Sequence, residues 1–423
     1  MREMKDSGIP WIGKIPKDWG IIKGKYILTY LQRPILSTDK VITCFRDGEV
    51  TLRSNRREEG FTISEKEIGY QGINVGDLVV HGMDGFAGSI GISDSRGKAS
   101  PVLNVLNSSQ DKKFLMYYLR SMAYNNVFLA LSTGIRVRSC DLNWNKLANL
   151  PYTIPSIKEQ QQIADYLDTK CARIDSIRKN VEAEIEALKQ YKQSVITEAV
   201  TKGLDKNVEM KASGIPWIGK IPKNWKVCPL KYNFKIISGS TPDSNNSSFW
   251  DGNINWITPA DFKTEDVYIT KGSRTISEDG YKSCGTTMIP AGNIIFSKRA
   301  PIGSVVINKI ALCTNQGCFG LIKETPEINT KYYYYILGVY PEVFNFLGTG
   351  TTFKEISAHT FSNVTLPFPP VQEQHRIADY LDTKCSRIDS IIQKKQDLLA
   401  NLDTYKKSMI YEYVTGKKEV PAV

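Results

Sequence analysis

Two stretches of the chain repeat apolar residues with the spacing of a coiled-coil helix. In residues 156–205 the seven-residue positions hold Leu167, Ile174, Val181, Leu188 and Val195, and the intervening positions hold Ile163, Cys171, Ile177, Ile185, Tyr191 and Ala199. In residues 369–423 the same heptad holds Leu381, Ile388, Leu402 and Met409, with Lys395 at one seam position as a candidate register marker. This spacing predicts two long helices that pack through an apolar seam.

The ends of both predicted helices are marked in the sequence. Ser156 and Glu159 fit a capping box, and a proline pair at 369–370 precedes the second helix. Gly203 and Gly416 stand where the two helices should end. At 1.5 Å per residue, roughly 45 residues give a rod on the order of 70 Å.

Between the helical stretches the pattern changes to short β-rich runs broken by Gly, Asn, Asp and Pro. A helical stretch follows late in each divergent segment, at 112–131 and at 331–347. Residues 74–78 (NVGDL) resemble 290–294 (PAGNI), and 131–134 (LSTG) resemble 347–350 (LGTG). We therefore expect two α/β globules with the same fold.

Self-comparison shows that the chain is one unit written twice. Residues 4–19 (MKDSGIPWIGKIPKDW) and 210–225 (MKASGIPWIGKIPKNW) differ at two positions. Residues 161–177 (QQIADYLDTKCARIDSI) and 375–391 (HRIADYLDTKCSRIDSI) differ at three. The flanks of each copy are thus nearly fixed, whereas the segments 20–154 and 226–368 diverge.

These patterns predict an α+β or α/β chain with a pseudo-two-fold internal repeat. The first globular domain covers 1–155, the first conserved helix 156–205, the second globular domain 206–368, and the second helix with its tail 369–423. Because a whole domain lies between the helices, the second must run back along the first, and antiparallel pairing buries both seams. The C-terminal tail is then expected near the opening segment.

Charge favours a partner dense in negative charge. Lys and Arg number 55 against 44 Asp and Glu, a net charge of +11, which suits nucleic acid. The eight cysteines form no C-x-x-C pair, so we expect reduced thiols rather than disulfides or a zinc site. No apolar signal core or membrane span is evident, and a cytoplasmic protein is expected.

Basic and small polar residues gather in particular loops of both divergent segments. In the first they are Arg33, Arg46, Arg53, Arg56, Arg57, Arg136 and Arg138, and in the second Ser240, Thr241, Lys298, Arg299, Thr349, Thr351 and Lys354. Arginine forks suit phosphates and guanine edges. For any single residue a solvated turn is the alternative, so the loops as groups form the candidate nucleic-acid site.

These motifs together resemble the specificity subunits of type I restriction-modification systems. The resemblance rests on SGIPWIGKIP and its second copy, on GSTPDSNNSSFWDGNINWITPADF at 239–262, and on LPFPPVQEQHRIADYLD at 366–382. It covers essentially the whole chain. It implies that the divergent segments are target-recognition domains, each reading one half of a bipartite, asymmetric site in double-stranded DNA.

The resemblance also implies partners. The repeated helices would form a spacer and a docking surface for two methyltransferase subunits, with restriction (translocase/endonuclease) subunits joining the larger complex. The chain would be a non-catalytic recognition subunit that binds no cofactor or metal, and S-adenosylmethionine, ATP and Mg²⁺ would be bound in partner subunits. Helix length would then act as a ruler that sets the half-site spacing near one DNA turn, ~34 Å.

A search for catalytic motifs finds none that satisfies its own chemistry. GIPWIGKI at 8–15 nearly matches a phosphate-binding loop, but Ile15 lacks the hydroxyl for Mg²⁺, Pro10 lacks a backbone donor and Pro16 disfavours a following helix. Trp11 and its repeat Trp217 indicate a hydrophobic docking segment instead. The three histidines are scattered, and no triad or metal cluster can be assembled from them.

Two other functions stay open at this point. One is a DNA nuclease or methyltransferase with an unrecognised active site, which turnover by the chain alone would reveal. The other is a coiled-coil interaction protein with no role on DNA, which an absence of salt-sensitive DNA binding in the presence of its partner would favour.

Overall fold

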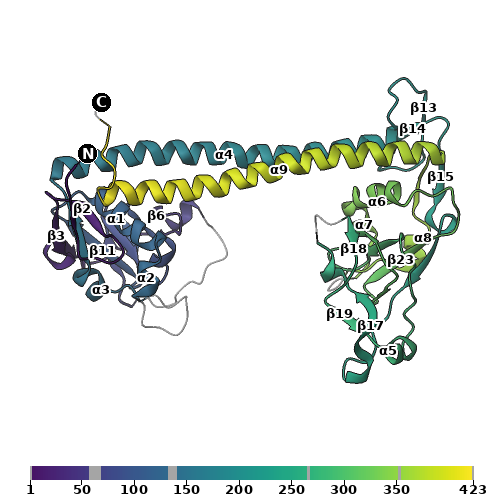
Figure 1. The fold of residues 1–423 in the computed structure, drawn as a ribbon, viewed down its shortest axis with the longest axis horizontal. Coiled ribbons are helices and arrows are strands. Elements are labelled where there is room, and N and C mark those ends of the chain that lie inside the picture. The colour runs from purple at the N-terminus through teal and green to yellow at the C-terminus, as the bar shows by residue number, and fades with distance from the viewer. Residues whose placement is uncertain (1, 57–67, 132–140, 264–266, 351–353, 422–423) are drawn as a thin grey trace. The chain divides into compact units, whose positions relative to one another are not determined.

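The computed structural model describes residues 2–56, 68–131, 141–263, 267–350 and 354–421 (Figure 1). The chain forms two compact units, unit 1 from 1–182 and 396–423 and unit 2 from 183–395. Helix α4 (Ile157–Lys202) and helix α9 (Val371–Val414) are each divided between the two units, with one part in unit 1 and the other in unit 2. Each unit therefore contains one divergent segment and two helical segments from opposite halves of the chain.

Unit 1 is built on a four-stranded antiparallel sheet in the order β4-β11-β8-β9. These strands are β4 (Leu28–Tyr30), β11 (Leu103–Ser108), β8 (Leu78–His81) and β9 (Ile90–Ile92). The other strands form pairs: β1 (Met4–Asp6) with β2 (Lys14–Pro16), β3 (Gly20–Lys23) with β12 (Pro151–Ile154), β5 (Ile42–Cys44) with β6 (Val50–Leu52), and β7 (Gln71–Ile73) with β10 (Gly97–Ala99). Helix α1 (Lys112–Tyr124) packs on β8 and β9, and α2 (Val127–Ala130) and α3 (Trp144–Asn149) follow.

Unit 2 contains a five-stranded sheet in the order β16-β23-β20-β21-β18. The strands are β16 (Phe234–Ser238), β23 (Cys318–Lys323), β20 (Ile294–Ser297), β21 (Val305–Asn308) and β18 (Tyr268–Ile269). A second sheet holds β19 (Arg274–Ile276), β17 (Trp250–Ile257) and β22 (Cys313–Thr314), with α5 (Glu278–Ser283) beside it. The remaining elements are β13 (Met210–Ala212) with β14 (Lys220–Pro222), β15 (Lys226–Pro229) with β24 (Thr365–Phe368), α6 (Thr330–Gly338), α7 (Pro341–Leu347) and α8 (Ala358–Ser362).

The two units share a common core, as the sequence echoes predicted. Strands β4, β11, β8 and β9 of unit 1 follow one another in the sheet as β16, β23, β20 and β21 do in unit 2. The echo at 74–78 and 290–294 leads into the equivalent strands β8 and β20. The predicted late helices form as α1 with α2 and as α6 with α7, and in unit 1 the break falls at Asn126, whose φ is 59°. The echo at 131–134 lies mostly outside the described residues.

The helical seam is confirmed at its heptad positions and wrong at two of the intervening ones. The seam residues Leu167, Ile174, Val181, Val195, Leu381, Ile388 and Met409 are buried, and Leu188 and Leu402 are half-buried. Ile177 and Tyr191 are exposed instead. The intervening seam position lies four residues after each heptad position. The seam therefore includes Arg178 and Lys192, and the preceding residues Ile177 and Tyr191 face solvent.

Ion pairs across the seam show the antiparallel direction. In unit 1, Lys406 contacts Asp175 at 2.6 Å and Arg178 contacts Asp403 at 2.9 Å. In unit 2, Lys192 contacts Asp389 at 2.7 Å, and Lys395, the candidate register marker, pairs with Glu184 at 2.5 Å. Residue numbers fall along α9 as they rise along α4 in both units. The antiparallel prediction is therefore confirmed within each unit (Figure 1).

Glycine ends both helices, as the sequence indicated. Gly203 follows α4 with φ +74° and Gly416 follows α9 with φ +70°, in the left-handed region that glycine adopts without strain. At the other end, the backbone N–H of Glu159 donates to Ser156 Oγ at 3.3 Å, which is half of the predicted capping box.

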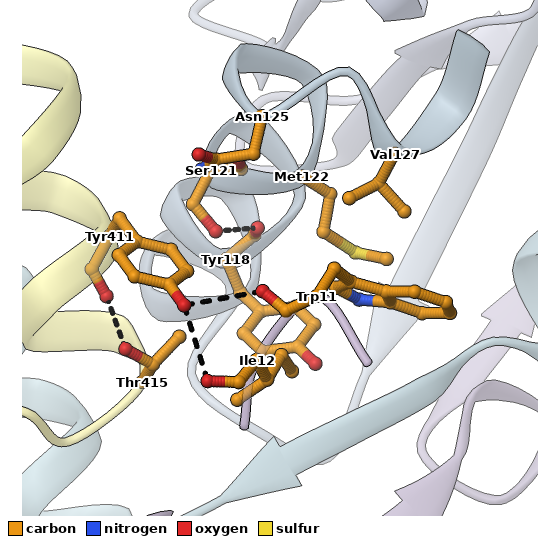
Figure 2. Close-up of a pocket in the computed structure, with 9 residues that line it drawn as sticks. All are labelled: Trp11, Ile12, Tyr118, Ser121, Met122, Asn125, Val127, Tyr411 and Thr415. Atoms are coloured by element: carbon orange, nitrogen blue, oxygen red, sulfur yellow. Dashed lines mark hydrogen bonds between the residues drawn. The ribbon is translucent and has the colours of Figure 1, made fainter. Parts of the chain in front are cut away.

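The C-terminal end of α9 packs on the opening segment of the chain within unit 1. Tyr411 Oη donates to the carbonyls of Trp11 and Ile12 at 3.2 Å (Figure 2). Lys417 Nζ donates to the Ile12 carbonyl at 2.6 Å. The Trp11 side chain lines a small cavity of about 10 Å³ with Tyr411, Thr415 and residues of α1. The expected closure of tail onto start is thus present, and the Trp11 segment docks on its own unit.

Both globular cores are fastened to a helix start by the same side chains. Trp19 Nε1 donates to Glu159 at 3.3 Å in unit 1, and Trp225 Nε1 donates to Glu373 at 2.9 Å in unit 2. Both indoles are almost completely buried. The contacts of α4 with α1 also correspond to those of α9 with α6. Gln160 and Gln374 accept a backbone hydrogen bond from the N-cap residue of α1 and of α6. Asp168 and Asp382 accept from Tyr117 and Tyr335 of the same two helices. The repeated flanks thus make the same contacts in both units, and we call this shared set of contacts the frame of each unit.

Candidate nucleic-acid interface

In unit 2, several polar loops leave the main sheet at one edge. Ser238 at the end of β16 pairs with Phe319, and Ser297 at the end of β20 pairs with Cys318, the first residue of β23. Segments 239–241, 298–299 and 315–317 therefore meet where β23 begins. We call these segments, with 349–350 and 354–355, the β23 edge. It brings together the predicted residues Ser240, Thr241, Lys298 and Arg299.

Backbone contacts hold the β23 edge in one arrangement. The Ser240 N–H donates to the Thr314 carbonyl at 3.0 Å, and Trp256 Nε1 donates to the Ser240 carbonyl at 3.0 Å. A Cβ on Gly239 would lie 2.1 Å from the Thr314 oxygen, so only glycine fits there. Thr241 Oγ1 donates to Gln316 Oε1. The loop after β16 is therefore fixed against the turn before β23.

Glu355 connects the remaining segments of the β23 edge. Its carboxylate contacts Lys298 Nζ at 2.8 Å and Arg299 Nε at 2.7 Å, and its backbone exchanges two hydrogen bonds with Thr349. Burial alone would raise the pKa of Glu355, but the hydrogen bonds from the two cations outweigh it and hold that pKa below its usual value. Lys354 beside it is exposed. The edge thus carries three cations against one carboxylate.

The equivalent place in unit 1 has the same backbone and different side chains. The Gly82 N–H donates to the Val102 carbonyl at 2.8 Å, as Lys298 N–H donates to the Gly317 carbonyl at 2.9 Å. We call residues 81–84 and 100–102 the β11 edge. His81 Nδ1 accepts from the backbone N–H of Met83 at 3.2 Å and of Asp84 at 3.0 Å. Burial lowers the pKa of His81.

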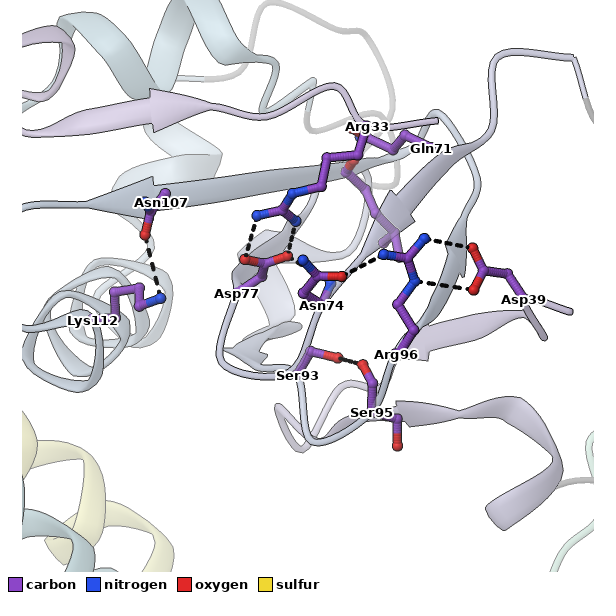
Figure 3. A network of polar contacts seen from close by, with 11 residues as sticks. Arg33, Asp39, Gln71, Asn74, Asp77, Ser93, Ser95, Arg96, Asn107 and Lys112 are labelled. Carbon is purple, nitrogen blue, oxygen red and sulfur yellow. Dashed lines mark hydrogen bonds and ion pairs between the residues drawn. The ribbon is translucent and has the colours of Figure 1, made fainter. Parts of the chain in front are cut away.

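Arg33 lies at the opposite end of β8 from the β11 edge. Its guanidinium forks onto the carboxylate of Asp77, which directly precedes β8 and whose side chain is 5% exposed (Figure 3). Arg96 extends the network by binding Asn74 at 2.6 Å and Asp39 at 2.9 Å. The hydrogen bond from Arg96 lowers the pKa of Asp39. The structure thus gives Arg33 a partner within the fold.

The other predicted arginines of unit 1 belong to the β5–β6 hairpin: Arg46 lies in its turn, and Arg53 and Arg56 come directly after it. Arg46 is 62% exposed and contacts Asp84 of the β11 edge at 2.9 Å. Arg53 Nε donates to Thr43 at 3.1 Å. Arg56 pairs with two carboxylates of the hairpin and lies 4.3 Å from the Phe45 ring. The predicted residues Arg57, Arg136, Arg138 and Thr351 lie outside the described residues.

The structure assigns no chemistry to the motifs that the sequence search rejected. The near-match at 8–15 runs into strand β2 (Lys14–Pro16), where a phosphate-binding loop needs a helix. Among the residues that the structure describes, no three His, Cys, Asp or Glu side chains form a group that could hold a metal ion. In the same part of the chain, no helix is long and apolar enough to cross a membrane.

Sequence reasoning missed three side chains that the fold makes important. Gln316 stands at the tip of the turn before β23, Glu355 pairs with two predicted cations, and Asp168 anchors the helix that follows β11. Asp168 has a signal in the repeat, because Asp382 matches it, but an acid on a helix face is typical of a surface position, and the pattern does not reveal the contact with Tyr117. Gln316 and Glu355 lie in divergent segments, where only the tertiary structure shows their neighbours.

Comparison with known proteins places the chain in a family. The family described as "Type I restriction modification DNA specificity domain" matches twice, at residues 28–187 and 222–400. The type I restriction enzyme MjaIX specificity subunit of Methanocaldococcus jannaschii is 37% identical over 42% of this chain and 41% of its own length. The MjaVIII specificity subunit of the same organism is 23% identical over 96% of this chain and 94% of its own length.

Solved structures support the same fold. A chain from a structure titled for complex assembly and conformational transition of the type I R-M system superposes with a TM-score of 0.76 at 17% identity, covering 96% of this chain and 99% of that one. The HsdS subunit from Thermoanaerobacter tengcongensis superposes with a TM-score of 0.55, also at 17% identity, covering 96% of this chain and 98% of that one. The likeness in fold extends over nearly the whole chain.

The chain belongs to the type I restriction-modification DNA specificity family. The expected family, the two recognition domains and the role in DNA sequence recognition are confirmed by the two matches. The relatives are named specificity subunits, which agrees with the prediction that this chain is the recognition component of a larger enzyme rather than the enzyme itself.

Proposed function

We propose that this chain reads a bipartite, asymmetric site in double-stranded DNA, with unit 1 on one half-site and unit 2 on the other. The observation that carries the proposal is the contrast between the two units. Their frames correspond side chain by side chain, from Trp19 and Trp225 to Asp168 and Asp382, whereas the β11 and β23 edges present different groups. Two units that share their internal contacts but differ in the side chains at their edges suit a DNA target whose two halves differ in sequence.

Phosphate contacts and base contacts would have separate sources in such a reader. The exposed cations Arg46 and Lys354 and the partly exposed Arg299 would bind phosphates and supply affinity that falls with salt. Polar side chains held in fixed loops would choose the bases. The helices α4 and α9, which both units share, would supply the spacer between the half-sites.

Exposed apolar side chains at matching positions support two copies of one partner. Tyr26 is 71% exposed and Tyr232 is 65% exposed, and each lies beside the ammonium of the preceding lysine, at 5.0 and 5.3 Å. Further exposed residues match in the same way: Ile21 with Val227, and Ile177 with Ile391. The recurrence of these exposed apolar side chains at equivalent positions of both units suits two copies of one partner protein. We assign these positions to two methyltransferase subunits.

Restriction subunits would join through that assembly. S-adenosylmethionine, ATP and Mg²⁺ would be bound by the partner subunits, which would supply the chemistry. In this arrangement the chain's own residues bind DNA, hold its register and present the target adenine's neighbourhood to the methyltransferase, which reaches an adenine by flipping it out of the helix.

The test is to express the chain with its methyltransferase partner in a host without adenine methylation and to map methylated adenines across the genome. The expected result is one two-part motif with a fixed unspecified spacer. Replacing residues 20–154 with the corresponding segment of another family member should change one half of the motif only. The control is the purified chain alone with S-adenosylmethionine and DNA. Methyl transfer by the chain alone, or a motif that changes in both halves, would contradict the proposal.

A further inference from the structure

The turn that precedes β23 presents one glutamine side chain to solvent. Asn315, Gln316 and Gly317 link β22 to β23, and of these Gln316 is exposed, whereas Gly317 and the following Cys318 are buried. The turn lies at the centre of the β23 edge, because Lys298 N–H donates to the Gly317 carbonyl at 2.9 Å and Thr241 contacts the Gln316 amide.

Backbone and Asn315 contacts close this turn without the Gln316 side chain. The Cys318 N–H donates to the Asn315 carbonyl at 3.2 Å, and the Gly317 N–H donates to Asn315 Oδ1 at 2.9 Å. The Asn315 N–H in turn donates to the Ile257 carbonyl at 2.9 Å. The amide of Gln316 is therefore not needed to form the turn that carries it.

The equivalent turn of unit 1 shows the same independence. The Leu103 N–H donates to the Ser100 carbonyl at 3.0 Å, as Cys318 does to Asn315, and the tip residue there is the exposed Pro101. A proline side chain has no hydrogen-bonding group. One turn, used twice at the same place in the fold, thus carries a hydrogen-bonding side chain in unit 2 and an apolar one in unit 1.

The contact with Thr241 orients the amide. Thr241 Oγ1 donates to Gln316 Oε1, which holds the carbonyl oxygen toward the loop after β16. Loop 239–241 is itself fixed by Ser240 and Gly239, so the amide has a rigid reference. Within the described part of the chain, the NH₂ group of Gln316 donates to no acceptor, and Oε1 keeps one lone pair. A donor and an acceptor side by side match the N7 and N6 edge of adenine in the major groove.

We propose that Gln316 is a specificity-determining residue of unit 2, that it reads one A·T pair in the second half-site through the adenine edge, and that Thr241 is its positioning residue. The proposal rests on the proposed function, in which unit 2 contacts one half-site. The neighbouring cations Arg299 and Lys354 supply phosphate affinity around this contact, so that the amide acts on sequence choice.

The experiment uses the full chain bound to its methyltransferase partner. Duplexes carry the methylation-mapped motif with each base pair of the second half-site replaced in turn, and Kd is measured by fluorescence anisotropy at fixed salt. Wild-type protein should discriminate at every specified position. In Gln316→Ala the discrimination at one A·T position should fall by about 5- to 150-fold, the equivalent of about 1–3 kcal/mol for a bidentate contact. Discrimination at the other positions should stay unchanged.

Two further variants sharpen the assignment. Gln316→Glu should move the preference at the same position toward cytosine, whose N4 amino group donates to a carboxylate. Thr241→Val should weaken discrimination at that position by less than Gln316→Ala, because the amide remains and only its orientation is released. Gln190→Ala, at an exposed glutamine of α4, is the matched control and should leave every position unchanged.

The possible failures are distinguishable. If wild-type complex discriminates at the second half-site and Gln316→Ala keeps the full pattern, Gln316 does not read a base and the inference is overturned. An equal loss of affinity for all sequences would make it a phosphate or folding residue and would overturn it as well. If the wild-type complex shows no sequence preference at all in the second half-site, the proposed function of unit 2 fails together with the inference.

Discussion

The β11 edge of unit 1 and the β23 edge of unit 2 are the same backbone with different chemistry. In unit 1 the strand that ends at His81 is followed by Gly82 and the exposed Met83, and the facing turn carries Pro101. In unit 2 the corresponding turn carries Gln316, and the strand end carries two cations on one carboxylate. Sheet hydrogen bonds fix the positions, and the side chains placed there are free to differ.

The frame beneath these edges differs much less, and the difference in tolerance has a physical cause. Trp19 and Trp225 are buried, and each donates one hydrogen bond to a glutamate on a helix start, so a smaller side chain at either position leaves a cavity and removes that hydrogen bond. Exposed residues at a loop tip have no such constraint. A duplicated chain can therefore keep its frame and vary its edges.

The largest expected effect tests whether the two frames are energetically equal. Trp19→Ala and Trp225→Ala should each lower the free energy of unfolding by ~3–5 kcal/mol, because each removes a fully buried indole. Urea unfolding of the full chain, with hydrogen exchange to show which unit opens, measures both. Tyr26→Ala, at an exposed ring, is the control and should change stability little. A large loss for one tryptophan and none for the other would break the equivalence.

The second prediction concerns the ion pair between Arg33 and Asp77, which unit 1 has and unit 2 lacks because Asn293 replaces Asp77 there. Arg33→Ala should cost ~3 kcal/mol, because the nearly buried carboxylate of Asp77 loses its cation. Asn293 occupies the equivalent place in unit 2, where its amide is satisfied by backbone groups. The double variant Arg33→Ala with Asp77→Asn should therefore recover most of the loss in urea unfolding.

DNA sequence choice gives the other half of the Arg33 test. Since Arg33 lies at the far end of β8 from the β11 edge, Arg33→Ala should leave the methylation motif unchanged. A motif altered in the first half alone would instead show that Arg33 contacts bases directly.

A smaller effect is expected from pH, and it should appear in unit 1 first. Burial lowers the pKa of His81 in the folded chain, so the unfolded chain binds the proton more tightly. The stability that His81 contributes is therefore fully present above its unfolded pKa, about 6.5, and is lost as pH falls toward the folded pKa. The protection factors of amides 81–84, which correct for the intrinsic pH dependence of hydrogen exchange, should fall between pH 7.5 and pH 5.5.

Unit 2 supplies the internal control for that titration. Ser297 stands where unit 1 has His81, and the acid-sensitive group of the β23 edge is Glu355, whose lowered pKa keeps its contribution in place above its unfolded value, about 4.3. Protection factors in the β23 edge should stay constant over the same pH range. His81→Gln should remove the pH dependence of unit 1, and a response that persists in this variant would assign it to another group.

The smallest effect concerns the ion pairs of the helical frame. Lys192 with Asp389 and Lys406 with Asp175 are equivalent pairs in the two units, at 2.7 and 2.6 Å. Their carboxylates are half-exposed, so Lys192→Ala and Lys406→Ala should each cost only ~0.2–1 kcal/mol, and equally. Thermal unfolding at low and high salt measures this. A loss above 2 kcal/mol in one variant alone would show that the helices are not symmetric in energy.

The sequence by itself determined the frame. A heptad pattern, helix-ending glycines and two nearly identical flanks were enough to predict two long helices, their antiparallel pairing and the closure of tail onto start, because periodic burial and repetition are local properties of a chain. The same pattern placed Ile177 and Tyr191 in the seam, although both are exposed. The residue three after a heptad position and the residue four after it lie on adjacent parts of the helix surface, and only the position of the partner helix decides which one is buried.

Only the tertiary structure decided which polar residues share a surface. Thr241, Lys298, Gln316 and Glu355 are separated by up to 114 positions in the sequence. Strand pairing at β23 and the bridge between Arg299 and Glu355 bring them to one edge. In the sequence, Arg33 looks like the other loop arginines, but in the fold it pairs with the nearly buried Asp77, at the far end of β8 from the β11 edge. Residue type shows what a side chain can bind, and the sheet register decides what it meets.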